Sequence, residues 1–148
     1  MRIVMIVLRW LLFLPIGLVA DVATGLLLKF VNSFWGMYEG FGYQIQVGVI
    51  PTIAGILVAG TIVPHYKIII TRLVCIVFGS MALLLIGYVF YMKPTIWLPR
   101  EIWLSLVKTA SYIVGAIIAY ICAPTVIEYS DEFEAKYPIF ATSKKISQ

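Results

Sequence analysis

Four long apolar runs constrain this chain more than any other feature of its sequence. A helix that crosses a bilayer needs about 20 mostly apolar residues, because the hydrocarbon is about 30 Å thick and each helical residue rises about 1.5 Å. The qualifying runs cover residues 3–28, 45–63, 68–92 and about 102–127. We therefore predict an all-α integral membrane protein with four transmembrane helices, in which residues 1–128 form one transmembrane domain.

Composition favours the same class. Of the 148 residues, 62% are hydrophobic and 12% are charged, whereas a soluble globular domain carries about 25% charged residues. A transmembrane β-barrel would show alternating segments of about ten residues, but these apolar runs are continuous. The first run is longer than the apolar core of about 7 to 15 residues in a secretory signal, so we expect it to remain as a span.

The positions of Lys and Arg predict the orientation. If the N-terminus is cytoplasmic, that side holds most of the basic residues, namely Arg2, Arg9, Lys67, Arg72, Lys136, Lys144 and Lys145. The other side holds Lys29, Lys93 and Arg100. Because basic residues favour the cytoplasmic side, both termini are expected there. The net charge of +4 then reflects topology and contact with anionic lipid. The basic residues form no stripe, so no nucleic-acid partner is expected.

An aspartate interrupts the first apolar run. Asp21 has Gly17 four residues before it and Gly25 four residues after it, and helical spacing places the three on one face. Glycines on a shared face let another backbone come close, and a carboxylate within a span faces protein and not lipid. This face is predicted to pack against another span.

The fourth run has a face of matching character. Small residues recur there at every fourth position, at Ser111, Gly115, Ala119 and Ala123. Lys108 leads into the same side. Counted from Lys29 and Glu101, Asp21 lies about 12 Å deep and Lys108 about 10 to 11 Å deep, and an unpaired charge in the bilayer costs several kcal/mol. We predict that these two helices pack together and that Asp21 forms an ion pair with Lys108.

Aromatic residues crowd the two outer connections, as is typical of membrane interfaces. The predicted interfacial anchors, or contacts to a partner, are Phe34, Trp35, Tyr38, Phe41, Trp97 and Trp103. The first connection has aromatic residues at helical spacing, which fits a segment lying flat in the interface. Its glycines also permit a re-entrant course, so both possibilities stay open.

The C-terminal region, residues 129–148, is expected to form a short cytoplasmic tail. Pro124 tends to interrupt the fourth helix, and Thr125 with Glu128 fits a capping box. A short amphipathic helix is therefore expected to restart there and to run to about Tyr137. Anionic lipid would repel its acidic cluster, which favours a protein partner; the cluster comprises Glu128, Asp131, Glu132 and Glu134.

Motifs for catalysis or metal binding are not visible. Cys75 and Cys122 lie within spans and have no Cys or His near them at ligand spacing, so no metal site is expected. The sequence contains no Gly-x-Ser-x-Gly nucleophile, phosphate loop or HExxH motif. We expect no cofactor and no enzyme activity.

Three functions fit this pattern. The favoured hypothesis is a small non-enzymatic membrane protein that acts through protein–protein contacts in the bilayer, as an accessory subunit or an immunity-type or exclusion-type inhibitor of a larger membrane complex. One alternative is a small proton- or cation-coupled transporter or channel centred on Asp21. The other is a lysis-type pore former whose helices associate laterally. No eukaryotic sorting signal is visible, so the expected location is the bacterial cytoplasmic (inner) membrane.

Overall fold

A computed structural model describes residues 2–36, 40–92 and 99–136, and its elements in these ranges are four α-helices. They are α1 (Arg2–Phe34), α2 (Phe41–Ile62), α3 (Lys67–Met92) and α4 (Arg100–Lys136). Each is long and apolar enough to cross a membrane. The prediction of an all-α chain with four potential membrane spans is therefore confirmed for the described residues.

Two helices extend furthest beyond the predicted spans. Helix α1 continues past residue 28 to Phe34, and α4 continues past residue 127 to Lys136. Apolar length locates the hydrocarbon of the bilayer, whereas the backbone hydrogen bonds that define a helix can continue into the polar interface. Hydropathy therefore underestimates the length of both helices.

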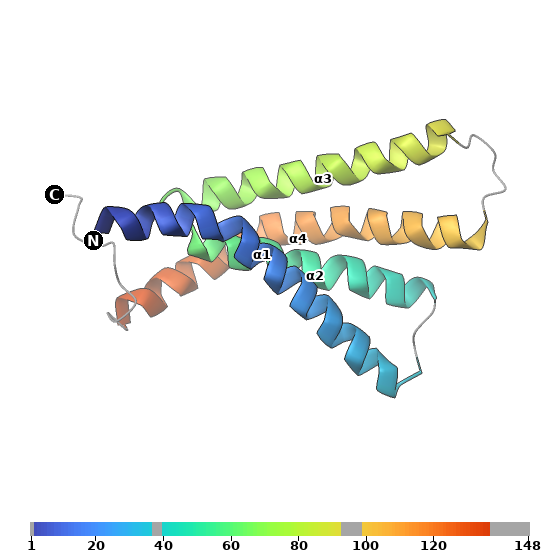
Figure 1. Cartoon of the computed structure of the whole chain (residues 1–148), viewed down its shortest axis with the longest axis horizontal. Helices are drawn as coiled ribbons and strands as arrows, with labels where there is room; N and C mark the ends of the chain where they lie inside the picture. Colours follow the sequence, from blue (N-terminus) through green and yellow to red (C-terminus); the bar gives the residue numbers. More distant parts are fainter. Residues whose placement is uncertain (1, 37–39, 93–98, 137–148) are drawn as a thin grey trace.

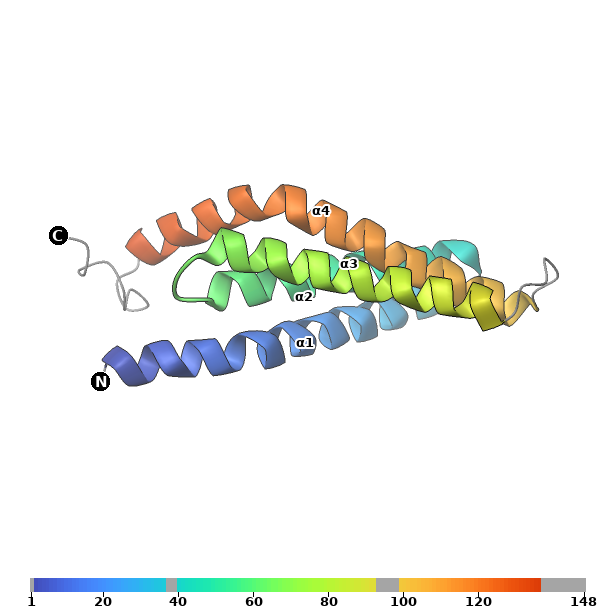
Figure 2. The same cartoon turned by 90° about the horizontal axis from the view of Figure 1, so that it is seen from above.

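The expected break at Pro124 is not present, because α4 runs through this proline as one helix. Proline removes one backbone hydrogen bond and its ring crowds the preceding turn, which bends a helix that neighbouring contacts keep intact. Helix α4 accordingly changes direction between its gold N-terminal part and its red C-terminal part (Figures 1 and 2). The segment after Pro124 is a bent continuation of the fourth span.

Helix α2 is the centre of the arrangement. Both α1 and α4 pack against it, while α3 packs mainly on α4 and less extensively on α2. Within the described ranges, no Cα atom of α1 lies within 8 Å of a Cα atom of α3 or α4. The start of α1 and the end of α4 lie at the same end of the molecule (Figure 1). The four helices thus form an open arrangement in which α1 is held by α2.

The distribution of small residues explains this centre. The buried residues of α2 are mostly small, and they comprise Gly48, Pro51, Thr52, Gly55, Ile56, Ala59 and Gly60. In contrast, most large apolar side chains of α1 and α3 are exposed. Helices approach one another closely where small residues meet, and large apolar residues then remain for lipid or for another protein.

Candidate functional site

The closest approach of α1 to α2 lies at Gly17 and Gly55. A Cβ atom added to Gly17 would lie 2.8 Å from the Cβ atom of Ala59 and 2.9 Å from the carbonyl oxygen of Gly55. A Cβ atom added to Gly55 would lie 2.9 Å from the Cβ atom of Asp21. Real Cβ atoms essentially never make contacts this short. The two backbones therefore approach this closely because both positions are glycine.

Gly25, the other glycine on the face of α1 that carries Asp21, has a looser environment. A Cβ atom there would meet the Cγ atom of Pro51 at 3.8 Å, which is ordinary van der Waals contact. Gly25 thus faces α2 as well, but the distance between the helices at this point does not require a glycine.

The small residues of α4 also pack on α2. A Cβ atom on Gly115 would lie 2.9 Å from the carbonyl oxygen of Val49 and 3.0 Å from the Cβ atom of Thr52. A Cβ atom on Gly48 would overlap the side chain of Ser111. Further along α4, Ala119 and Ala123 are fully buried.

The expected direct packing of the first span on the fourth is therefore wrong, because each of these small-residue faces meets α2 instead. The physical reason is that α2 offers small residues to both neighbours. Gly55 and Ala59 face α1, whereas Gly48 and Thr52 face α4. The same spacing of small residues fits more than one neighbour, so spacing alone did not identify the pair.

Asp21 and Lys108 meet α2 at different heights. Asp21 lies against Gly55, while the backbone of Lys108 lies against Gly48, and these glycines are about 10 Å apart along the helix axis. In the part of the chain that the structure describes, no N–O distance of 4.0 Å or less joins the two side chains. Their direct ion pair stays a prediction.

The end of α1 accounts for the difference in height. The depth of Asp21 was counted from Lys29, but α1 continues to Phe34. Asp21 therefore lies about 20 Å from the end of α1 at Phe34, whereas Lys108 lies about 12 Å from the start of α4 at Arg100.

A groove of about 210 Å³ opens beside Asp21 between α1, α2 and α3. We call it the Asp21 groove. Its residues are Leu14, Gly17, Leu18 and Asp21 of α1, Thr52, Gly55, Ile56 and Ala59 of α2, and Val74 and Phe78 of α3. The groove exists because α1 packs on α2 without approaching α3. The surface of the groove is almost entirely apolar, so neither the carboxylate of Asp21 nor the hydroxyl of Thr52 forms an appreciable part of it.

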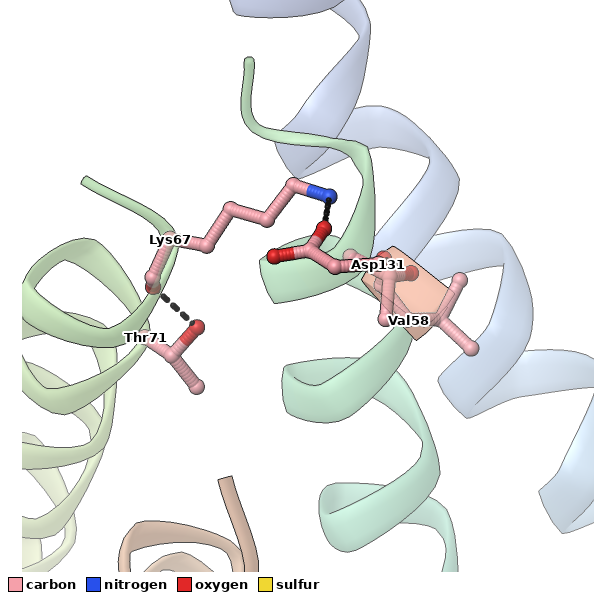
Figure 3. Close-up of polar contacts among 5 residues, drawn as sticks. Val58, Lys67, Thr71 and Asp131 are labelled. Atoms are coloured by element: carbon pink, nitrogen blue, oxygen red, sulfur yellow. Dashed lines mark hydrogen bonds and ion pairs between the residues drawn. The ribbon is translucent and has the colours of Figure 1, made fainter. Parts of the chain in front are cut away.

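The long C-terminal part of α4 is held by the start of α3. Lys67 Nζ donates a hydrogen bond of 2.6 Å to Asp131 Oδ1, and these groups also form an ion pair (Figure 3). Thr71 Oγ1 donates to the carbonyl oxygen of Lys67 at 2.7 Å (Figure 3). One member of the predicted acidic cluster thus has a partner within the chain, so this acid gives no separate argument for a protein partner.

A second contact between α3 and α4 lies deeper in the helices. The guanidinium carbon of Arg72 lies 5.0 Å from the centre of the Tyr120 ring, a distance suited to a cation–π interaction. The Lys67–Asp131 pair and this contact together tie α3 to α4.

The aromatic anchors at the other end of the molecule are partly described. Phe34, Trp35, Phe41 and Trp103 are exposed, as side chains at a membrane interface would be. Tyr38 and Trp97 lie outside the described residues. Helix α1 includes Phe34, and α2 starts at Phe41. The connection is therefore short, and its aromatic residues belong largely to the helix ends.

Sequence reasoning missed the residues of α2 that make the close helix contacts. Gly55 and Ala59 meet α1, Gly48 meets Ser111 of α4, and Gly60 meets Thr71 of α3. Their signal was present, because Gly55 and Ala59 have the same four-residue spacing as Gly17 and Asp21. A hydrogen bond from Asn32 Nδ2 to Gln46 Oε1, 3.2 Å long, was also not expected.

The described residues contain no group of three or more His, Cys, Asp or Glu side chains that could hold a metal ion. What the Asp21 groove offers chemically is an almost wholly apolar hollow, which suits apolar side chains or lipid. Asp21 itself is half-buried where α1 meets α2, and its carboxylate can accept a proton or a hydrogen bond. In comparisons with known proteins, no family model, no curated protein and no solved structure matches the chain.

Proposed function

We propose that this chain is a small polytopic membrane protein that acts through protein–protein contacts inside the bilayer. In this role it serves as an accessory subunit or an immunity-type or exclusion-type inhibitor of a larger membrane complex. The observation that carries the proposal is the position of Asp21, a half-buried acid in the middle of the apolar helix α1. A charged group within a span is costly in contact with lipid and is usually satisfied by protein groups.

The exposed apolar surface of α1 and α3 supports the proposal less strongly. Large apolar side chains on the outside of a membrane protein suit lipid as well as another protein. Asp21 is different, because hydrocarbon has nothing to offer a carboxylate. The charge of Asp21 is therefore the feature that favours a protein contact over lipid.

The proposed location is a bacterial cytoplasmic membrane with both ends of the chain in the cytoplasm. The start of α1 and the end of α4 lie at one end of the molecule (Figure 1), which supports a common side for both. Lys67 and Arg72 belong to the part of α3 nearest that end, and basic residues favour the cytoplasmic side.

Affinity capture in mild detergent tests the proposed function. The full chain, carrying an affinity tag, should be recovered from its native membrane in a complex larger than itself and of constant composition. Glu101→Gln, a change of an exposed acid at the start of α4, should leave that recovery unchanged. Recovery of the chain as a monomer under conditions that preserve other membrane complexes would count against the proposal.

One alternative has a structural observation in its favour. Because Asp21 is half-buried where α1 meets α2, a proton- or cation-coupled transporter would use its carboxylate as the carrier group. Purified chain in vesicles would then carry protons or cations down an imposed gradient, and Asp21→Asn would abolish the flux. Flux equal to that of empty vesicles would exclude this alternative.

A further inference from the structure

We propose that the surface between α3 and α4 binds a phospholipid with a negatively charged headgroup. The phosphate of this lipid lies at Arg72, and one of its acyl chains fills the apolar hollow that begins beside Tyr120. The inference goes beyond the proposed function, because α1 and Asp21 take no part in the site. It follows from an exposed cation, from the hollow next to it, and from the length that the two span together.

A hollow of about 270 Å³ lies between α3 and α4, which run alongside each other (Figures 1 and 2). Cys75, Gly79 and Leu83 border it on α3, and Ile113 and Tyr120 are among the residues that border it on α4. Its surface is almost entirely apolar, and none of the residues that line it is charged. Such a surface suits hydrocarbon.

Gly79 keeps this hollow open. A Cβ atom added to Gly79 would meet nothing within 4 Å, so the packing of the helices does not require a glycine there. Gly60 of α2 is different, because a Cβ atom on it would overlap the side chain of Thr71. The glycine at position 79 therefore leaves space on the surface and does not bring two helices together.

An exposed cation lies at one end of the hollow. Arg72 is exposed, and it comes one helical turn before Cys75 and Ile76, which line the hollow. Its guanidinium carbon lies 5.0 Å from the centre of the Tyr120 ring, and Tyr120 lines the hollow from α4. Within the described parts of the chain, no carboxylate oxygen lies within 4.0 Å of an Arg72 nitrogen. These parts of the chain therefore leave the charge of Arg72 without a counter-ion.

The charge of Arg72 selects the headgroup. The Tyr120 ring is near one face of the guanidinium, whereas the N–H donors of a guanidinium lie in its plane and can bind an anion. Arginine binds phosphate through charge-assisted hydrogen bonds, which are often bidentate. A choline headgroup brings a cation of its own to the site, and an anionic headgroup does not, so basic residues at a membrane surface favour anionic lipid.

The length of the site matches one leaflet of a bilayer. Leu83 is eleven residues after Arg72, which is about 16 Å along the helix, and half of the hydrocarbon thickness is about 15 Å. An acyl chain whose phosphate lies at Arg72 therefore reaches Leu83 near the middle of the bilayer. A helix with its side chains is about 10 to 12 Å wide. A hollow of about 270 Å³ that extends from Cys75 to Leu83 is too narrow for a helix and suits a single acyl chain.

Native mass spectrometry of the full chain in mild detergent tests the headgroup. The chain is titrated with dioleoyl phosphatidylglycerol and, separately, with dioleoyl phosphatidylcholine, and the Kd of the first lipid bound is measured. We expect phosphatidylglycerol to bind about fivefold more tightly, as one basic residue at a membrane surface would provide. Arg72→Gln should remove this preference and Arg72→Lys should keep most of it. Arg100→Gln, at an exposed arginine that starts α4, is the matched control and should keep it in full.

A variant that fills the hollow tests the acyl chain independently of the charge. Gly79→Leu places a side chain in the hollow and should weaken binding of both lipids about fivefold or more. Gly87→Leu is the matched control, because Gly87 is also in α3, a Cβ atom on it also meets nothing within 4 Å, and it does not line the hollow. Both changes raise helix propensity equally. Circular dichroism and the elution volume of each variant verify that it is folded.

Several outcomes would overturn the inference. Equal binding of the two lipids, or a preference that survives Arg72→Gln, would remove Arg72 from the site. Equal binding by Gly79→Leu and Gly87→Leu would remove the hollow. Displacement of phosphatidylglycerol by millimolar inorganic phosphate would show a site for the phosphate group alone. Displacement by a synthetic transmembrane helix with one central Glu, in the unchanged chain but not in Arg72→Gln, would assign the site to a protein partner.

Discussion

The Cβ atom of Asp21 on α1 lies directly against Gly55 on α2, at a point where an added methyl group on Gly55 would come within 2.9 Å of it. The same contact that lets α1 approach α2 therefore sets the depth and direction of the carboxylate. Asp21 borders the groove because its backbone is held by glycines on both helices. Packing and the candidate site are thus determined together.

Replacement of Gly55 by Ala should lower the free energy of unfolding by about 1 to 3 kcal/mol. The new methyl group would also lie 2.9 Å from the carbonyl oxygen of Gly17, so α1 must move away from α2. Alanine is intrinsically better than glycine in a helix by about 0.5 to 1 kcal/mol, so a net loss reports on packing. Titration with SDS in mixed micelles, followed by tryptophan fluorescence, measures the change.

Gly79→Ala is the control for this prediction. A Cβ atom at Gly79 meets nothing within 4 Å, so the helix preference of alanine should leave stability unchanged or slightly higher. If both variants unfold at the same SDS fraction, the close contact at Gly55 does not stabilise the protein.

Changes at Asp21 and Lys108 test whether these two side chains form an ion pair. Without a contact of 4.0 Å or less, the two side chains should show a coupling energy below about 0.5 kcal/mol in a double-mutant cycle of Asp21→Asn and Lys108→Met. Asp21→Asn alone should leave the free energy of unfolding unchanged or raise it by up to about 1 kcal/mol, because it removes a charge from the bilayer. A coupling well above this limit would instead establish the predicted ion pair.

Asp131→Asn should loosen the C-terminal part of α4 with little effect on the rest of the molecule. The Lys67 side chain is 10% exposed and that of Asp131 is 51% exposed, so the pair is expected to contribute about 0.2 to 1 kcal/mol. Proteolysis after the last membrane span should become faster in the variant. The difference should shrink in about 1 M salt, where charges are screened within about 3 Å. Glu128→Gln, at an exposed acid of the same helix, should digest like the unchanged chain.

The number and approximate positions of the helices were predictable, because apolar length is a physical requirement for crossing a bilayer. Their ends were not. Helix α1 reaches Phe34 through polar residues, and one of these, Asn32, donates its side-chain hydrogen bond to Gln46 of α2. A contact between two helices thus extends α1 beyond its apolar run, and no property of the run itself contains that information.

The helix that packs against the face of α1 with Gly17, Asp21 and Gly25 was harder to predict from the sequence than the face itself. Periodicity placed Gly17, Asp21 and Gly25 together correctly, since all three contact or approach α2. It did not distinguish α2 from α4, because both have small residues at four-residue spacing. The short connection between Phe34 and Phe41 was the better guide, as consecutive elements joined by short loops usually lie side by side.

The two cysteines should differ in their reaction with a membrane-permeant maleimide. Cys75 is 4% exposed and packs in the core with Ile56 and Ala119, whereas Cys122 is half-buried. Since access limits alkylation of a buried thiol, Cys75→Ser, which leaves Cys122, should be labelled about tenfold faster or more than Cys122→Ser in mild detergent. After unfolding in SDS the two rates should become similar, which controls for intrinsic reactivity. Equal rates before unfolding would show that α4 does not cover Cys75 of α3 as it does in the structure.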